Sequence, residues 1–255
     1  MKLLQVNHVK KVYNTRLGAR QCVALEDVGF SVDQGEFVAI MGASGSGKTT
    51  LLNILASLDK PTSGDVCLEN RSFSAIPDRE LSAFRRDNLG FVFQDFNLLD
   101  TFTLRDNILL PLVLQKTAVH EMEKRIEPLA RSLGLTELLD KFPYEVSGGE
   151  KQRAAVARAV ITNPLLLLAD EPTGALDSRS SAALLGIFED LNAQGQTILM
   201  VTHSSMAASY ASRVLFIKDG RLFSQLFRGQ MGRREFFDRI VSNLSVLSDG
   251  GVDIG

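Results

Sequence analysis

Residues 36–50 of the chain read EFVAIMGASGSGKTT, and this stretch decides the fold. After Glu36, residues 37–41 form an apolar run that is typical of a buried strand. Three closely spaced glycines follow within residues 42–47 and predict a tight turn. From Lys48 to Leu55 leucine and isoleucine recur with a helical period. The stretch therefore predicts a strand, a glycine-rich turn and a helix in immediate succession.

Residues 42–49 match the phosphate-loop pattern GxxxxGK[ST]. Glycines allow the backbone N–H groups to turn inward, and the helix N-terminus adds positive potential, so the loop can cradle a polyphosphate. Lys48 would reach the β- and γ-phosphates, and the Thr49 hydroxyl would ligate Mg²⁺. The alternative for these residues alone is a glycine-rich turn that carries a surface lysine.

The bulk composition excludes some functions. The chain has 255 residues, of which 45% are hydrophobic and 23% charged, as is ordinary for a soluble globular protein. Its net charge of -2 supplies no electrostatic argument for nucleic acid as a partner. Cys22 and Cys67 show neither metal-ligand spacing nor a disulfide framework, so we expect free thiols in a reducing compartment.

The chain also lacks the pattern of a membrane span. Its longest apolar-rich stretch, residues 108–114, contains Pro111 and is shorter than the roughly 18–20 residues that a span requires. The N-terminus has no apolar segment or cleavage site of a signal peptide. We therefore expect a cytoplasmic protein whose membrane role, if any, acts through another chain.

Hydrophobic periodicity outlines the domain. Alternation predicts half-exposed strands over residues 2–13 and 22–33. Short apolar runs predict further strands at residues 65–68, 89–93, 165–169, 197–201 and 214–218. Helical patterns cover residues 78–86, 103–162 (with an amphipathic segment at 118–133), 180–192 and 234–247. Strands that alternate with helices imply a mainly parallel sheet covered on both faces.

The helical block interrupts this α/β core in the sequence. We expect the core over residues 1–95 and 164–225, with a helical subdomain at about 96–163 between the two parts. Residues 230–255 would form a C-terminal helix and a fraying, glycine-containing tail.

A second motif, LLLLADEP at residues 165–172, is an apolar strand that ends in two carboxylates. The carboxyl ends of parallel strands are where an α/β sheet places ligand-binding groups. Asp170 is suited to hold Mg²⁺ directly or through water, and Glu171 to take a proton from an attacking water. An acidic turn at a strand end is the structural alternative.

A third motif, VSGGEKQR at residues 146–153, opens a helix that we expect to run to about Thr162. Ser-Gly-Gly at a helix N-terminus can bind an anion. The same residues can equally be a capped helix with Ser147 as the N-cap, and taken alone they do not decide between the two.

Together and in this order, the motifs resemble those of the ATP-binding subunit of ATP-binding-cassette (ABC) transporters, over nearly the whole chain. In the family's terms, residues 42–49 resemble the Walker A loop, 165–171 the Walker B strand, 147–150 the signature motif, Gln94 the Q-loop, 174–177 the D-loop and His203 the switch histidine. Tyr13 stands where the family places an aromatic ring that stacks on adenine. Three positions depart from the family pattern, namely Val146 for leucine, Glu150 for glutamine, and Ser204 where many relatives carry an acid.

The resemblance implies an α/β fold over residues 1–229. This is a P-loop NTPase (RecA-like) core with an N-terminal antiparallel β subdomain and an inserted α-helical subdomain. It implies ATP and Mg²⁺ as cofactors, an ATPase activity coupled to transport, and catalytic roles for Glu171, His203, Lys48 and Gln94. Expected nucleotide ligands are Tyr13, Gly42, Ser44, Gly45, Ser46, Gly47, Lys48, Thr49, Thr50, Ser147, Gly148, Gly149, Glu150 and Asp177, and expected metal ligands are Thr49, Gln94 and Asp170.

The family also implies partners. Two copies would meet head to tail, so that the signature motif of one covers the γ-phosphate bound to the other. A separate permease would hold the dimer at the cytoplasmic face of the membrane, with no nucleic acid involved.

Residues 90–99, 144–153, 207–210 and 216–220 are most similar to the bacitracin-resistance type, which serves permeases that handle antimicrobial peptides, often together with a sensor kinase. Lipoprotein-release, macrolide-efflux and cell-division relatives share the main motifs and remain alternatives. A non-catalytic regulatory module is a further one, although such a module would be expected to have lost Glu171 or His203.

One segment after Gln94 is too apolar for a freely solvated loop. It contains Phe96, Leu98, Leu99, Phe102 and Leu104. These side chains either all fill the helical core or leave some members exposed for the permease. We expect that some are exposed in the isolated subunit.

Overall fold

The computed structural model describes residues 1–14 and 21–249 of the chain, and the expected tail at 250–255 lies outside them. The chain forms two compact units. Unit 1 combines Met1–Pro77 with Leu199–Gly255, and unit 2 is Asp78–Ile198. The helical subdomain expected at about 96–163 falls within unit 2.

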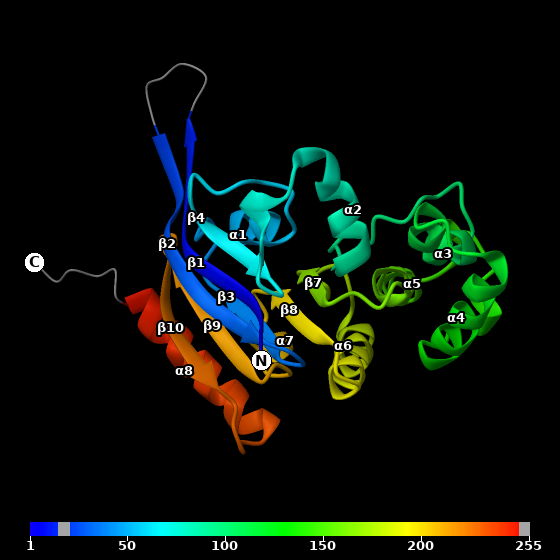
Figure 1. Ribbon diagram of the computed structural model, residues 1–255. Helices are drawn as coiled ribbons and strands as arrows, with labels where there is room; N and C mark the ends of the chain where they lie inside the picture. Colours follow the sequence, from blue (N-terminus) through cyan, green and yellow to red (C-terminus); the bar gives the residue numbers. More distant parts are fainter. Residues whose placement is uncertain (15–20, 250–255) are drawn as a thin grey trace, which may run out of the picture. The chain divides into compact units, whose positions relative to one another are not determined.

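Unit 1 begins with an antiparallel sheet, as expected (Figure 1). Its strands are β1 (Lys2–Asn14), β2 (Gln21–Asp33), β4 (Ser63–Leu68) and β5 (Arg71–Ser72), in the order β5-β4-β1-β2. Apolar side chains of β1 and β2 are buried, among them Val6, Val9 and Val28. Their spacing departs from the strict alternation expected from the sequence, and the pairing of β1 with β2 shifts in register between Val6 and Val9.

The second part of the sheet in unit 1 carries the phosphate-loop stretch. β3 (Phe37–Met41) is buried throughout and pairs in parallel with β9 (Arg213–Lys218). A hairpin joins β9 to β10 (Arg221–Phe227), which lies beside β2. The sequence pattern did not predict β10 as a strand. Asp219 and Gly220 both have positive φ, the conformation of a two-residue hairpin turn.

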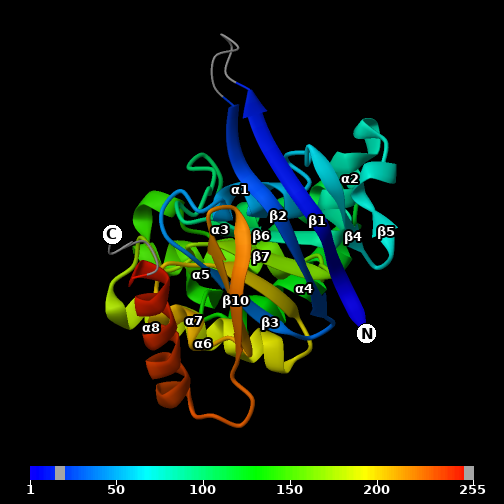
Figure 2. The ribbon, with the colours of Figure 1, turned by 90° about the vertical axis from the view of Figure 1, so that its left-hand side faces the viewer.

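Three α-helices complete the described part of unit 1. They are α1 (Lys48–Leu55), α7 (Ser205–Ala208) and α8 (Arg233–Asp249), with a 3₁₀ turn η1 (Phe73–Ala75). α8 runs beside the β9–β10 hairpin (Figures 1 and 2). Phe236 and Ile240 of α8 are fully buried, and the Arg233 guanidinium lies 3.8 Å from the centre of the Tyr210 ring. The C-terminal helix is therefore packed on unit 1.

Unit 2 contains a strand pair and most of the helices. Its elements are α2 (Asp78–Asn88), β6 (Leu89–Val92), α3 (Leu104–Leu114), α4 (Val119–Ser132), α5 (Gly148–Val160), β7 (Leu166–Asp170) and α6 (Ser178–Ala193), with short 3₁₀ turns η2 (Thr136–Leu138) and η3 (Pro143–Glu145). β6 and β7 are parallel, as their apolar runs predict. β8 (Thr197–Val201) contains the boundary between the units.

The helices α3, α4 and α5 share one apolar core in unit 2. Its fully buried members include Leu104, Ile108 and Leu112 of α3, Ile126 of α4, and Ala154 of α5. Burial of a leucine or isoleucine side chain contributes about 1.5–3 kcal/mol, so this cluster holds the helical block together. In the part of the chain that the structure describes, no helix is long and apolar enough to cross a membrane.

Candidate nucleotide-binding site

The phosphate-loop lysine is held inside its own loop. Lys48 is the first residue of α1, is 5% exposed, and donates hydrogen bonds of 2.9 Å to the backbone oxygens of Gly42 and Ala43. The ammonium group therefore lies within the turn between β3 and α1. This is the position from which it can reach an anion cradled by the loop.

Two glycines of the loop have no room for a side chain. A Cβ on Gly42 would lie 2.2 Å from the backbone oxygen of Ile217 in β9. A Cβ on Gly47 would lie 2.4 Å from the backbone oxygen of Ala24, and φ at Gly47 is +100°. The close approach of β2 and β9 thus requires the glycines that define the motif.

The loop and the predicted switch histidine line one pocket of about 390 Å³ in unit 1. Its lining runs through residues 41–46, His203, the end of β9 at residues 217–219, and Leu244 of α8. The Ser46 hydroxyl is buried and has no hydrogen-bond partner among the described residues. A glycine-rich loop and an unpartnered hydroxyl in one pocket, with the Lys48 ammonium hydrogen-bonded to the backbone of the same loop, fit a bound polyphosphate.

His203 follows directly on the end of β8 and is exposed at the pocket. The N–H of Thr202, just before it, donates to Ile40 in β3 at 3.0 Å. Ser204, which stands where relatives carry an acid, is the N-cap of α7, and its hydroxyl accepts from the N–H of Ala207 at 3.2 Å. The departure at residue 204 therefore has a structural role after the histidine.

Tyr13 lies near the end of β1 and is 41% exposed. Its hydroxyl donates to Asp59 at 2.8 Å, and the Lys11 ammonium donates to the same carboxylate at 2.6 Å. Burial acts to raise the pKa of Asp59, but the hydrogen bonds from Lys11 and Tyr13 oppose it and the pKa is lowered. Tyr13 does not line the pocket of Lys48's loop, so its role with adenine stays a prediction.

The two carboxylates of the second motif lie where β7 ends in unit 2. Asp170 is the last residue of β7, and Glu171 follows with φ of +44°. A left-handed conformation is uncommon for a residue other than glycine, and such residues often lie at functional sites. The turn continues with a hydrogen bond from the N–H of Gly174 to the oxygen of Glu171 at 2.9 Å.

Gln94 of the predicted Q-loop lies against this turn. A Cβ on Gly174 would lie 3.1–3.3 Å from the side-chain atoms of Gln94. The structure therefore brings the predicted Q-loop and D-loop together within unit 2.

Gln152 of α5, which lies within the third motif but was not predicted as a site residue, joins the same two segments. It is fully buried, and its side-chain amide donates to the oxygens of Phe93 at 3.1 Å and Pro172 at 2.8 Å. A polar residue in line with the buried helix positions Gly149 and Val156 is the signal in the sequence that could have revealed it.

The signature residues form the N-terminus of α5. Ser147 is the N-cap, and its hydroxyl accepts from the N–H of Glu150 at 3.4 Å. The Glu150 carboxylate accepts from the N–H of Ser147 at 2.7 Å and from its hydroxyl at 2.8 Å. These bonds, the backbone one above all, lower the pKa of Glu150. The structure thus shows the capped helix, which is compatible with an anion-binding terminus.

Asp177 caps the next helix. Its carboxylate accepts from the N–H groups of Arg179 and Ser180 at 2.9 and 3.0 Å and from the Ser180 hydroxyl at 2.6 Å. Hydrogen bonds from Ser180 lower the pKa of Asp177. A Cβ on Gly149 would lie 3.0 Å from that hydroxyl, and one on Gly148 would lie 3.7 Å from the Leu176 side chain, so the signature motif packs against the D-loop and the start of α6.

The apolar segment after Gln94 is divided between core and surface. Leu104 is fully buried, so this residue belongs to the helical core and not to an exposed surface. Phe96 and Leu98 are half-buried, while Leu99 and Phe102 are 44% and 38% exposed. Our expectation that some of the five side chains are exposed is confirmed for Leu99 and Phe102.

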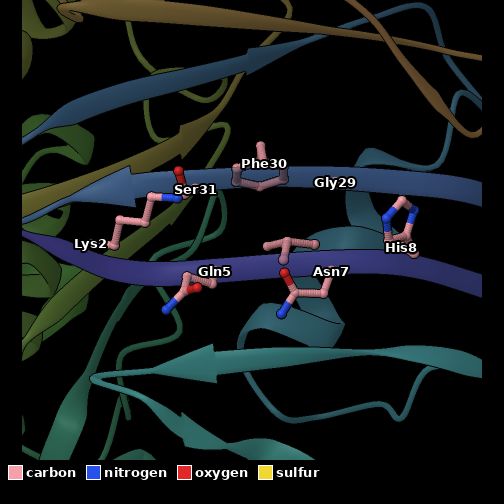
Figure 3. Close-up of a pocket in the computed structure, with 8 residues that line it drawn as sticks. Lys2, Gln5, Asn7, His8, Gly29, Phe30 and Ser31 are labelled. Carbon is pink, nitrogen blue, oxygen red and sulfur yellow. The ribbon is translucent and has the colours of Figure 1, made fainter.

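A second pocket, of about 360 Å³, lies on the polar face of β1 and β2. Figure 3 shows Lys2, Gln5, Asn7 and His8 along one strand and Phe30 and Ser31 along its neighbour. None of the predicted site residues lines it, so we place the candidate site at the loop of Lys48.

The protein-family model described as ABC transporter matches residues 25–174 of this chain. This match covers more than half of the chain, and the chain therefore belongs to the ABC transporter family, as an ATP-binding subunit with the P-loop ABC ATPase fold. Family membership implies ATPase activity coupled to transport.

Named relatives extend over nearly the whole chain. It is 52% identical to the uncharacterized ABC transporter ATP-binding protein YvcR of Bacillus subtilis, over 97% of this chain and 95% of that protein. It is 47% identical to the bacitracin export ATP-binding protein BceA of Halalkalibacterium halodurans, over 99% of this chain and 98% of that protein. The dimeric structure of the bacterial ABC transporter cassette MJ0796 matches with a TM-score of 0.80 at 38% identity, over 88% of this chain and 98% of that cassette.

Proposed function

We propose that this chain hydrolyses ATP to power a separate membrane permease that handles antimicrobial peptides of the bacitracin type. The supporting observation is the likeness to BceA, at 47% identity over 99% of this chain. A match of that extent takes in the packed C-terminal helix α8 as well as the motifs that all members of the family share.

The pocket in unit 1 supports nucleotide binding. Gly42–Thr50 would hold the phosphates, with Lys48 against the β- and γ-phosphates and Tyr13 against the adenine. Thr49, Asp170 and Gln94 would hold Mg²⁺, which when bound neutralises charge on the phosphate oxygens. The glycine cradle and the unpartnered Ser46 hydroxyl are the features of this chain that fit the phosphates.

Glu171 and His203 would carry the reaction. Glu171 accepts a proton from water as the water oxygen bonds to the γ-phosphorus and the bond to the β–γ bridging oxygen breaks. His203, exposed at the pocket beside the loop, would hydrogen-bond the γ-phosphate and orient it.

The chain would act as a homodimer. Ser147–Glu150 and Asp177 would cover the γ-phosphate held by the other copy. The capped N-terminus of α5 presents backbone N–H groups to an anion, and the likeness to the dimeric MJ0796 cassette supports this arrangement. The permease would bind at Leu99 and Phe102, which are exposed although apolar, and would hold the dimer at the cytoplasmic face of the membrane.

The test is a deletion of the gene, complemented with the wild-type chain or with Glu171→Gln. The wild type should restore growth in bacitracin, and Glu171→Gln should not, because the amide cannot accept the water's proton. A macrolide is the matched control. Restored resistance to the macrolide but not to bacitracin would assign the chain to a different transporter of the family.

A further inference from the structure

We propose that Arg158 and Asn107 are positioning residues that clamp the segment from Phe96 to Thr103, so that a force applied at this segment reaches the signature motif. The inference rests on the proposed function, because it gives that segment the role of contacting the permease.

Arg158 fixes the start of the segment. It lies near the end of α5, and its guanidinium donates to the backbone oxygens of Phe96, at 2.9 Å, and Asn97. Both residues have positive φ, +62° and +49°. Two consecutive left-handed residues other than glycine are unfavourable in isolation. The two charge-assisted hydrogen bonds from one planar group hold the backbone in this conformation.

Asn107 fixes the end of the segment. It is fully buried in the first turns of α3. Its side-chain oxygen accepts from the N–H of Leu99 at 2.7 Å. Its side-chain N–H groups donate to the oxygens of Leu99 at 3.0 Å, Phe102 at 3.2 Å and Thr103 at 2.9 Å. One amide thus meets the hydrogen-bonding needs of a loop that has no regular ladder of its own.

The clamped segment also connects the exposed side chains to the signature motif at the start of α5. Leu98 packs on the helical core, while Leu99 and Phe102, which follow it in the chain, are exposed to solvent. A Cβ on Gly148 of the signature motif would lie 3.8 Å from the Phe96 ring. α5 therefore touches this segment at both ends of the helix, through Gly148 at its start and Arg158 near its end.

This arrangement explains why two polar residues are held among apolar neighbours. If the segment were flexible, a displacement of Leu99 or Phe102 by the permease would change only the conformation of the loop and would not reach the helices. Because its carbonyl groups are bound to α3 and α5, a displacement must move these helices. α5 begins with the Ser147–Glu150 terminus, which we propose covers the γ-phosphate of the other copy.

The isolated chain offers a direct test, because it contains no tryptophan. Phe102→Trp places a single reporter in the segment. Arg158→Lys, which keeps the charge but loses the planar fork, and Asn107→Asp, which keeps the shape but loses the donors, are made in this background. Arg131→Lys, on the exposed face of α4, is the matched control.

We expect both clamp variants to lower the fluorescence anisotropy of the reporter and to increase acrylamide quenching, with Arg131→Lys unchanged. The Leu99 amide should exchange its hydrogen about tenfold faster in a third variant, Asn107→Leu, which keeps a similar size but removes the oxygen that accepts from the Leu99 N–H, the factor expected for loss of one hydrogen bond. An unchanged anisotropy and exchange rate in a folded variant would overturn the proposal. The two variants remove different contacts, so if one fails to fold the other still decides.

A second arm measures transmission. Stripped inverted membrane vesicles from the source cells, which contain the permease, are added to each chain without the reporter. We expect vesicle-stimulated ATP turnover to fall about tenfold in both variants while KM for ATP stays unchanged, since the clamp does not touch nucleotide. Normal stimulation of the variants would contradict the proposal. Absence of stimulation in the wild type would instead count against the proposed function. The fluorescence experiment on the isolated chain would still test whether Arg158 and Asn107 hold the segment.

Discussion

The carboxylate of Glu150 binds back to Ser147, with 2.7 Å to the backbone N–H and 2.8 Å to the hydroxyl. Relatives with glutamine at this position would make the same contacts without the charge. In this chain the interaction is charge-assisted, and it fixes the first turn of α5.

This contact should be visible in the pH dependence of stability. The pKa of Glu150 lies below its usual 4.5 in the folded chain, so its contribution is present above that pH and is lost as pH falls through the folded pKa. We expect Glu150→Gln to lower the free energy of unfolding near neutral pH by about 0.3–1.5 kcal/mol. The difference from wild type should shrink below pH 4.5, as measured by urea unfolding across the pH range. A difference that persists undiminished at acid pH would show that the charge is not involved.

Lys48→Ala should abolish productive ATP binding. The lysine supplies a charged hydrogen bond to phosphate worth about 1.5–3 kcal/mol, and it also holds the oxygens of Gly42 and Ala43. Equilibrium titration with a fluorescent ATP analogue measures the loss. Lys124→Ala, exposed on α4, is the control and should bind as the wild type does. Near-normal binding by Lys48→Ala would refute the assignment of this loop.

Glu171→Gln should keep nucleotide affinity and lose hydrolysis by about 10²–10⁴-fold, the usual contribution of a general base. The variant should then accumulate as an ATP-bound dimer, which light scattering with ATP and Mg²⁺ detects. Glu123→Gln, on an exposed position of α4, should turn over normally. A monomer with ATP demonstrably bound would contradict the head-to-tail arrangement.

Gly47→Ala and Gly45→Ala form a matched pair within the loop. Both glycines have positive φ, but a Cβ at residue 47 would lie 2.4 Å from the oxygen of Ala24, whereas a Cβ at residue 45 meets nothing within 4 Å. We expect Gly45→Ala to cost about 1–2 kcal/mol of stability without nucleotide, from backbone conformation alone. Gly47→Ala should lower the melting temperature further, because β2 must also shift. Equal melting temperatures would show that the approach of β2 is not restrictive.

Serine substitutions separate the surface of the apolar segment from its core. Leu99→Ser and Phe102→Ser, at exposed positions, should leave the melting temperature nearly unchanged and reduce stimulation of ATPase activity by the permease. Leu104→Ser, at a fully buried position, should destabilise the chain by at least the roughly 2–5 kcal/mol typical of truncating a core leucine. Thermal unfolding of the three variants shows which of these side chains belong to the core and which to the surface. A large drop for Leu99→Ser would show that this side chain belongs to the core.

Much of the fold could be predicted from local pattern. The strand at residues 197–201 is observed with the same bounds, and the helix expected at 118–133 is observed as Val119–Ser132. β10 was missed because its seven residues alternate between exposed and half-buried positions and form no apolar run.

The residues of the candidate site likewise include some that local pattern predicted and some that it missed. The phosphate loop, the carboxylates after β7 and Ser147 were readable because their chemistry requires particular residues at adjacent positions. Local pattern did not predict the roles of three other residues. These are Leu244 at the pocket, Gln152 between Phe93 and Pro172, and Arg158 against Phe96.

The sequence by itself determined the strand–loop–helix that binds phosphate, the order of the motifs and the helical block between them. These depend on periodicity, glycine conformation and caps, which act between residues a few positions apart. Only the tertiary structure decided that Leu99 and Phe102 are exposed while Leu104 is buried, and that Arg158 binds a loop about 60 positions before it. Burial and pairing of this kind depend on which distant segments pack together, because a polar group removed from water must find its partner wherever the fold places one.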